Sequence, residues 1–334
     1  MKIVYLLGNG FDLSLGMKTG YKDFYEYYQS TNSKSEVVKK LKDEISGDLE
    51  NWSDLELAFG KYTEKINSQD EYDELIEDLL GNLGEYLCYQ EEKLDVSILD
   101  REKFCNYLAY PEESLLQADK NKLKAFRNNY KNSRVSIVTF NYTRVVEKII
   151  GEKYSNIQIT THQNGGRSTL SGVEHIHGYT DRRMILGVND ISQIQNKSFH
   201  NNTDVLESLV KRNCNKVLRH TRDSFVENQI NSANLICIYG SSIGDTDKVW
   251  WELIGERLRS NVKLIIFVKD KPINPLFEYK SIRIERKIVE NFLTKTNLEE
   301  KEKEKVKDNI FIGLNTQMFN IKSTSFSESK AVEK

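Results

Sequence analysis

Proline and cysteine are scarce in this sequence, and long apolar runs are missing. Its 334 residues include three prolines, too few for a proline-rich linker between separate domains. The four cysteines contain no C-x-x-C pair, so the sequence indicates neither a zinc site nor a thioredoxin-like motif. We expect reduced, buried thiols in a cytoplasmic protein. No apolar run approaches the roughly 18 residues of a membrane-spanning helix, so we expect no membrane segment.

An excess of charge of either sign is also missing. The chain has 48 Lys and Arg residues against 50 Asp and Glu residues, a formal net charge of −2 at pH 7. This balance argues against a generic basic nucleic-acid binder. The first residues, MKIVYLLGNGFD, lack the apolar core and cleavage site of a signal peptide, so we expect none. With 17 Tyr and 14 Phe, the composition is that of a folded globular protein.

Strand and helix patterns alternate along most of the chain, but one long stretch is helical throughout. Residues 3–7 form a continuous apolar run and predict a buried strand. The next strand follows a layer of about 120 residues with helical spacing. Further strands are predicted at residues 135–140, 157–161, 173–177, 184–188, 235–239, 262–268 and 310–314. Helices are predicted at residues 21–28, 34–45, 53–66, 69–91, 143–150, 205–211, 222–230, 248–258 and 282–293.

This order predicts an α/β fold with a mostly parallel sheet, because strand–helix units favour parallel strands joined by right-handed crossovers. The sheet domain would comprise residues 1–18 and 132–320, with residues 19–131 as a large helical insertion after the first strand. Residues 321–334 predict a disordered tail. The size and position of the insertion suit a lid or a contact between copies of the chain.

Four of the predicted strands end in glycine or polar residues that a packed core does not require. The four segments are residues 8–12, 141–143, 175–178 and 240–245. Ligands of parallel α/β sheets bind outside the carboxyl ends of the strands. If the sheet is parallel at these strands, all four segments meet at one edge, and we expect the binding site there.

Two of these segments suit a ligand that carries phosphate. Gly8 and Gly10 leave room for a pyrophosphate near the backbone, and the hydroxyls of Ser241 and Ser242 can bond phosphate or ribose. The G-x-G-x-x-G pattern fails, however, because Leu13 takes its last position. A tight strand-to-helix turn is therefore the alternative explanation of the first glycines.

Polar residues at the other strand ends also allow structural interpretations. Asn141 directly follows a strand, where Asn is commonly a turn-former. Asp245 and Asp247 precede a predicted helix and could serve as its N-caps.

Two histidines, His175 and His177, are two positions apart on a predicted strand and would face the same way. Together with His162 they could bind a metal ion. No Glu or Cys stands at a diagnostic spacing. We therefore predict no metal, and a structural histidine is the alternative.

In this order the segments resemble the AbiH family of bacteriophage abortive-infection proteins. G-N-G-F-D at residues 8–12, followed by G-M-K-T-G-Y-K-D-F at residues 16–24, is similar to the opening motif of that family. Later motifs are similar to W-S-D-L-E at 52–56, F-N-Y-T at 140–143, H-I-H-G at 175–178 and Y-G-S-S-I-G-D at 239–245. The resemblance extends over residues 1–266. More distantly, the order is similar to sirtuin-like NAD-binding domains, which implies a Rossmann-like, sirtuin-like sheet.

The likeness to sirtuin-like enzymes implies NAD as ligand or substrate. It makes His177 the general base and Asn141 the residue that positions water or a ribose hydroxyl. In such a reaction Asp12 would either bond a ribose hydroxyl or stabilise developing positive charge. Thr143 replaces an Asp of that pattern and the zinc-binding Cys quartet is missing, so we expect no peptide deacylation. The expected contacts to the nucleotide fall on Gly8, Asn9, Gly10, Gly240, Ser241, Ser242 and Asp245, with Phe11 and Tyr142 as pocket walls or as core residues.

We therefore predict an antiphage abortive-infection effector that binds NAD or a related nucleotide and hydrolyses it at the nicotinamide–ribose bond. A nucleotide-binding sensor of phage defence without turnover is the first alternative. The second is a nucleic-acid-directed, RNA-cleaving effector. Its surface would be the basic cluster, which a solvated helix surface also explains: Lys211, Arg212, Lys216, Arg219, His220 and Arg222. How the effector is held inactive before infection stays open between oligomerisation, a phage-derived trigger and low expression.

Overall fold

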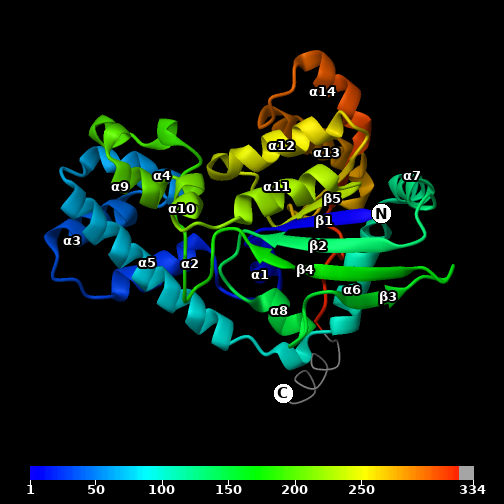
Figure 1. Cartoon of the computed structure of the whole chain (residues 1–334), viewed down its shortest axis with the longest axis horizontal. Coiled ribbons are helices and arrows are strands. Elements are labelled where there is room, and N and C mark those ends of the chain that lie inside the picture. Colours follow the sequence, from blue (N-terminus) through cyan, green and yellow to red (C-terminus); the bar gives the residue numbers. More distant parts are fainter. Residues whose placement is uncertain (323–334) are drawn as a thin grey trace.

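One seven-stranded sheet lies at the centre of the computed structural model, which describes residues 1–322 (Figure 1). The strand order is β3-β4-β2-β1-β5-β6-β7. All neighbouring strands are parallel except β3 and β4, which form an antiparallel hairpin. The strands are β1 Lys2–Leu7, β2 Ser133–Thr139, β3 Ile157–Thr161, β4 Arg167–His175, β5 Leu235–Tyr239, β6 Lys263–Val268 and β7 Ile310–Leu314.

Helices cover both faces of this sheet and also form a unit of their own. They are α1 Gly10–Ser14, α2 Tyr21–Ser30, α3 Glu36–Gly47, α4 Leu55–Tyr62, α5 Gln69–Glu92, α6 Arg101–Ala109, α7 Gln117–Arg127, α8 Val145–Ile150, α9 Thr203–Leu209, α10 Lys211–Val217, α11 Arg222–Ser232, α12 Lys248–Leu258, α13 Tyr279–Thr294 and α14 Glu300–Val306. The predicted mixed α/β fold with a mostly parallel sheet is confirmed. The likeness of this sheet to the Rossmann-like sheet of sirtuin-like domains stays a prediction. Within residues 1–322, no helix combines the length and apolarity needed to cross a membrane.

The apolar runs fold as strands because helices bury them from both sides. Five successive residues of β1 are buried, as expected of a parallel strand in the middle of a sheet. α6, α7 and α8 contribute to the core on one face, and α11, α12, α13 and α14 contribute to the core on the other. These two cores hold the strand ends, and with them the candidate site, in fixed positions.

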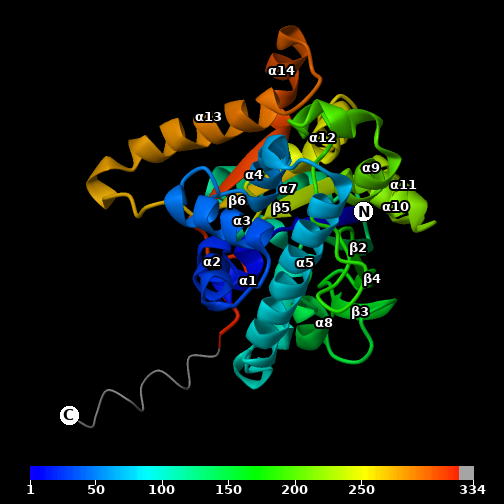
Figure 2. The same ribbon diagram turned by 90° about the vertical axis from the view of Figure 1, so that its left-hand side faces the viewer.

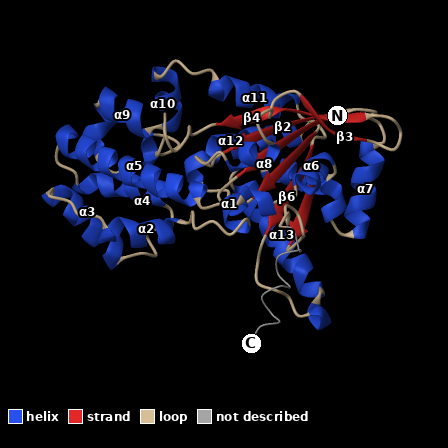
Figure 3. Ribbon diagram, turned by 90° about the horizontal axis from the view of Figure 1, so that it is seen from below, coloured by secondary structure: helices blue, strands red, loops and turns tan. Residues whose placement is uncertain are grey.

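The helical unit has a separate core, built by α2 to α5 together with apolar residues between Leu186 and Val210. It lies beyond the carboxyl ends of the strands (Figures 1 and 3). Figure 2, which looks onto this unit, shows its helices side by side in front of the sheet. Three of them begin at residues whose side chains accept a backbone hydrogen bond, namely Ser35, Asp54 and Ser68. The predicted domain boundaries stay a prediction. Within the predicted insertion, apolar residues of α6 and α7 pack in the core of the sheet.

Three segments differ from the prediction. Residues 184–188 form no strand, because Leu186 and Val188 pack into the core of the helical unit instead of pairing along a sheet. The predicted helix at 205–211 is divided, since Val210 has extended backbone between α9 and α10. Of the predicted tail, Ile321 is buried in the sheet core, so that residue is ordered by packing. Residues 323–334 of the tail lie outside the described residues.

Candidate functional site

Four strand ends meet at one edge of the sheet and border a single cleft. β4, β2, β1 and β5 are adjacent and parallel, so the segments that follow them leave the sheet in the same direction. The cleft has a volume of about 2360 Å³. Tyr21, Asp54 and Glu56 of the helical unit line it as well. Eleven of the twelve residues predicted for the site also line the cleft: Gly8, Asn9, Gly10, Asp12, Asn141, Tyr142, His177, Gly240, Ser241, Ser242 and Asp245.

Phe11 is the predicted site residue that the structure does not bring to the cleft. Its side chain has no exposed surface, and its ring packs against Phe104, Tyr239 and Phe319 at centroid distances of 5.9, 6.3 and 5.3 Å. Phe11 therefore anchors the loop in the sheet core, which corrects its assignment as a contact to the nucleotide.

The glycines after β1 and β5 form one interlocked floor. Gly8 N donates to Tyr239 O at 2.9 Å and Gly10 N donates to Gly240 O at 2.8 Å. A Cβ atom on Gly10 would lie 2.5 Å from the Cα of Gly240. Gly240 itself has a φ of +69°, which glycine adopts at no steric cost. Contact between the two loops is therefore enough to explain why these positions are glycine.

Asn9 ties this floor to the segment that leads into the helical unit. Its Nδ2 donates to the carbonyl of Thr19 at 2.8 Å, and its Oδ1 accepts from the hydroxyl of Thr19 at 2.6 Å. The loop after β1 and the start of α2 are thus held together.

A buried carboxylate, Asp12, sits at the base of the cleft between two strand ends. Asn141 Nδ2 donates to its Oδ1 at 2.9 Å, and the Thr143 hydroxyl donates to its Oδ2 at 2.6 Å. Burial raises the pKa of Asp12 to about 7, although both hydrogen bonds favour the ionised form. Asn141 Nδ2 also donates to the carbonyl of Gly8 at 3.2 Å. Within residues 1–322 the Oδ1 atom of Asn141 has no hydrogen-bond partner, so it can accept one from a ligand or a water molecule.

The segment after β5 offers hydroxyls and an acid to the cleft. Ser241 Oγ accepts from Ile243 N at 3.1 Å, and Ser242 is exposed. Asp245 forms an ion pair with Lys295 at 2.7 Å, which draws its carboxylate toward the end of α13. Asp247 occupies the N-cap position of α12, as predicted, although its side chain accepts no capping hydrogen bond there. The N-cap interpretation of Asp245 is wrong, because Gly244 precedes the turn that begins at Asp245.

The three histidines considered as metal ligands have separate partners. β4 ends at His175, so His175 and His177 do not share a strand face. His175 Nδ1 contacts the carbonyl of Asn141 at 2.9 Å and its Nε2 contacts Glu147 at 2.8 Å. His162 contacts the Tyr110 hydroxyl at 2.5 Å. Within residues 1–322, no three His, Cys, Asp or Glu side chains gather as a set of metal ligands.

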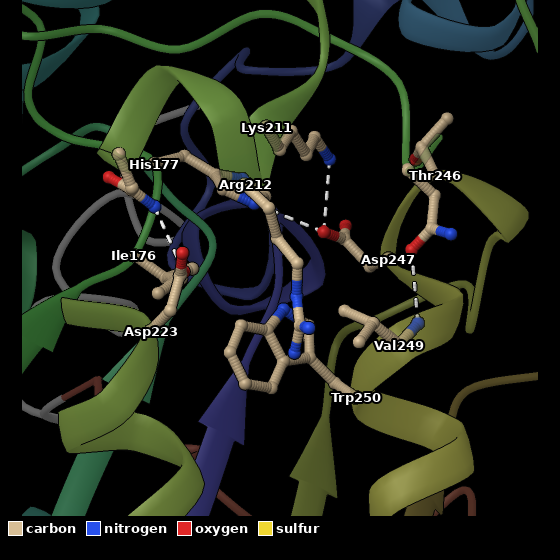
Figure 4. Close-up of a pocket in the computed structure, with 11 residues that line it drawn as sticks. Ile176, His177, Lys211, Arg212, Asp223, Thr246, Asp247, Val249 and Trp250 are labelled. Atoms are coloured by element: carbon tan, nitrogen blue, oxygen red, sulfur yellow. Dashed lines mark hydrogen bonds and ion pairs between the residues drawn. The ribbon is translucent and has the colours of Figure 1, made fainter. Parts of the chain in front are cut away.

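His177 belongs instead to a buried polar network. Its Nε2 lies 3.0 Å from Oδ1 of Asp247, and Lys211 Nζ lies 3.0 Å from the same oxygen. Lys211 Nζ also lies 2.8 Å from Oε2 of Glu56. Figure 4 shows Lys211 reaching the Asp247 carboxylate beside a small cavity that His177 also lines. We call these four residues, Glu56, Lys211, Asp247 and His177, the charge network.

Burial and charge act in opposite directions on this network. Burial disfavours the ionised form of Asp247, but the charges of Lys211 and His177 hold its pKa below the usual range. Burial raises the pKa of Glu56 despite the neighbouring Lys211. Burial would lower the pKa of Lys211, but the carboxylates of Asp247 and Glu56 raise it. The Lys211–Asp247 pair is therefore charged at neutral pH.

Sequence reasoning missed three members of the charge network. Glu56 lay within the W-S-D-L-E segment without an assigned role, Asp247 was interpreted as a helix cap, and Lys211 was counted in the basic cluster. Lys211 is in fact buried. Two further members of that cluster are paired with acids, Arg212 with Glu227 at 2.7 Å and Arg222 with Glu174 at 3.2 Å. These contacts leave fewer free cations for a nucleic acid than the sequence indicated.

Comparison with known proteins identifies the family. The family model described as bacteriophage abortive infection AbiH matches residues 4–268, most of the chain. No curated protein matches the sequence. The more distant likeness to sirtuin-like domains stays a prediction. The match includes the segments that follow β1, β2, β4 and β5, and the chain belongs to the AbiH family of bacteriophage abortive-infection proteins.

Proposed function

We propose that this protein is an abortive-infection effector that binds NAD in the cleft and hydrolyses it at the nicotinamide–ribose bond. The observation that carries the proposal is the convergence of four strand ends on one cleft, with Asp12, Asn141 and His177 along its wall. Loss of NAD would stop the metabolism of an infected cell and so end the infection, in keeping with the family.

The cleft suits a dinucleotide in position and size. Ligands of parallel sheets bind outside the carboxyl ends of the strands. Pockets for drug-sized ligands commonly enclose about 300–1,000 Å³, and the cleft is larger, at about 2360 Å³. The hydroxyls of Ser241 and Ser242, which line the cleft next to Gly240, would bond the oxygens of the diphosphate.

The proposed reaction consumes water and releases a proton. The C1′–N bond of NAD breaks with its electron pair on nitrogen, so nicotinamide leaves as a neutral molecule and the ribose gains oxocarbenium character. Water adds to C1′ and loses one proton, which gives ADP-ribose. Asn141 Oδ1 would orient the water or a ribose hydroxyl, and His177 would accept the proton. The ionised form of Asp12 would stabilise the positive charge.

Incubation of the purified protein with NAD tests this proposal, with free nicotinamide as the readout. His177→Ala and Asn141→Ala should each lower the rate of release by at least about 100-fold, a common effect of removing a general base or a positioning group. The matched controls His220→Ala and Asn129→Ala lie outside the cleft and should retain the wild-type rate. Binding of NAD is measured separately by calorimetry.

Two outcomes would overturn hydrolysis. Binding of NAD without release of nicotinamide, alone and in extracts of phage-infected cells, would instead favour a nucleotide sensor. Absence of NAD binding under both conditions would remove NAD from the account altogether.

A further inference from the structure

The charge network joins the helical unit to the sheet at the catalytic histidine of the proposed reaction. Glu56 lies on α4 and Lys211 begins α10, whereas Asp247 precedes α12 and His177 follows β4. Glu56, Lys211 and His177 are each less than 9% exposed, and the Asp247 side chain is 15% exposed. Residues up to 191 positions apart in the sequence thus share one chain of contacts, from Glu56 to Asp247.

The contact with Asp247 decides which ring nitrogen of His177 carries the proton. An ionised carboxylate can only accept hydrogen bonds. The negative charge of Asp247 lies 3.0 Å from Nε2 and would repel a lone pair there, so the carboxylate favours a proton on Nε2 over a lone pair. In a neutral imidazole this leaves the lone pair on Nδ1.

The rest of the network keeps Asp247 ionised and in place. Lys211 supplies a positive charge 3.0 Å from the Asp247 oxygen, and Glu56 holds Lys211 from its other side at 2.8 Å. An isolated buried charge is costly, whereas a buried charge with paired, close partners is tolerated. Breaking the network at Lys211 would leave two carboxylates facing each other in the interior.

We propose that Asp247 is a positioning residue that fixes His177 as its Nε2–H tautomer, with Nδ1 as the base, and that Lys211 and Glu56 hold Asp247 in this role. The inference rests on the proposed function for its kinetic consequence, but its structural part concerns the free protein. The proposal also gives the helical unit a part in catalysis, because Glu56 belongs to that unit. Within the described chain, no residue of the sheet makes the contact with Lys211 that Glu56 makes.

Nitrogen NMR of the full-length protein labelled with ¹⁵N-histidine tests the structural part, with His177→Ala used to assign the His177 signals. At a pH high enough for His177 to be a neutral imidazole, the wild-type protein should show the Nε2–H tautomer. In Asp247→Asn the amide can either accept or donate, so the preference for this tautomer should be lost. Unchanged ring signals in Asp247→Asn, or an Nδ1–H tautomer in the wild-type protein, would overturn the proposal whether or not NAD is hydrolysed.

Kinetics then distinguish positioning from general stability. Asp247→Asn and Lys211→Met should lower kcat for nicotinamide release about 100-fold with little change in KM. Lys211→Arg should recover much of this loss because it keeps the charge. Glu112→Gln is the matched control, since Glu112 forms a similarly buried pair at 3.1 Å with Arg127 of α7, a helix that packs on the sheet core, and lies outside the cleft. An equal fall in kcat for Glu112→Gln would contradict positioning. If the wild-type protein releases no nicotinamide, the proposed function fails, and the NMR result still decides the tautomer.

Discussion

Asp12 is an acid that the fold keeps almost entirely away from water, at 2% exposure. Because burial raises its pKa from 3.8 to about 7, the folded state resists ionisation of this side chain more than the unfolded state does. Below pH 3.8 the side chain is protonated in both the folded and the unfolded state, so its burial costs no stability. As the pH rises through about 7, the free energy of unfolding falls, because ionisation stabilises the unfolded state more than the folded state. Between pH 5.5 and pH 8 the penalty grows by roughly 2 kcal/mol.

Asp12→Asn should remove this dependence. The amide can accept from Asn141 and donate to Thr143, so the buried hydrogen bonds survive. We expect the free energy of unfolding of the variant to rise relative to the wild-type protein by roughly 2 kcal/mol on going from pH 5.5 to pH 8. Urea denaturation at both pH values measures it, and equal differences at the two values would contradict the assigned burial effect.

Individual side chains could be predicted where the local sequence limits their position. Asp12, Asn141 and His177 follow strand ends, and parallel pairing brings such residues to one edge. Phe11 lies next to Asp12 in α1 but turns into the core, because a large apolar side chain gains more from burial than from lining a wet cleft. Lys211 and Asp247 could not be paired from the sequence, since their contact depends on how two separate segments pack.

The loops after β1 and β5 act as one element because their backbones touch. A Cβ atom on Gly240 would lie 2.5 Å from Phe11 N, and the φ of +69° is unfavourable for alanine. Gly240→Ala should therefore cost about 3 kcal/mol of stability and weaken NAD binding. Thermal unfolding and calorimetry check the two effects.

Gly81→Ala is the control of opposite sign. Gly81 is exposed within α5, and an added Cβ would meet no atom within 4 Å. It should stabilise the protein by about 0.5–1 kcal/mol and leave NAD binding unchanged, because alanine favours a helix interior. Similar stability for Gly240→Ala and wild type would show that the two loops separate easily, against the interlocked floor.

A helix or strand could be predicted from the sequence where its pattern of apolar residues also determines which neighbours bury it. The run at residues 3–7 is buried on both faces and could only be a central strand. Residues 184–188 have a similar apolar run, but the helical unit buries it. Apolarity alone does not say which core a short segment joins, and this is why that strand prediction was wrong.

The molecule as a whole combines a mostly parallel sheet with a helical unit that lies beyond the carboxyl ends of its strands (Figure 3). The sequence predicted the sheet and the helical stretch after β1. It could not indicate that Leu186 and other residues up to Val210 complete the core of the helical unit, because that packing joins segments separated by more than 90 positions in the chain. A contact between copies of the chain and a phage-derived trigger stay predictions at this level.

The NAD content of infected cells is the measurement that bears most directly on the central claim. In cells that produce the wild-type protein, we predict that NAD falls and nicotinamide rises after phage infection, before lysis. His177→Ala and Asn141→Ala should keep NAD at the level of uninfected cells and lose protection, whereas His220→Ala should behave as wild type. Protection by the wild-type protein with unchanged NAD, or protection that persists in both cleft variants, would contradict the account.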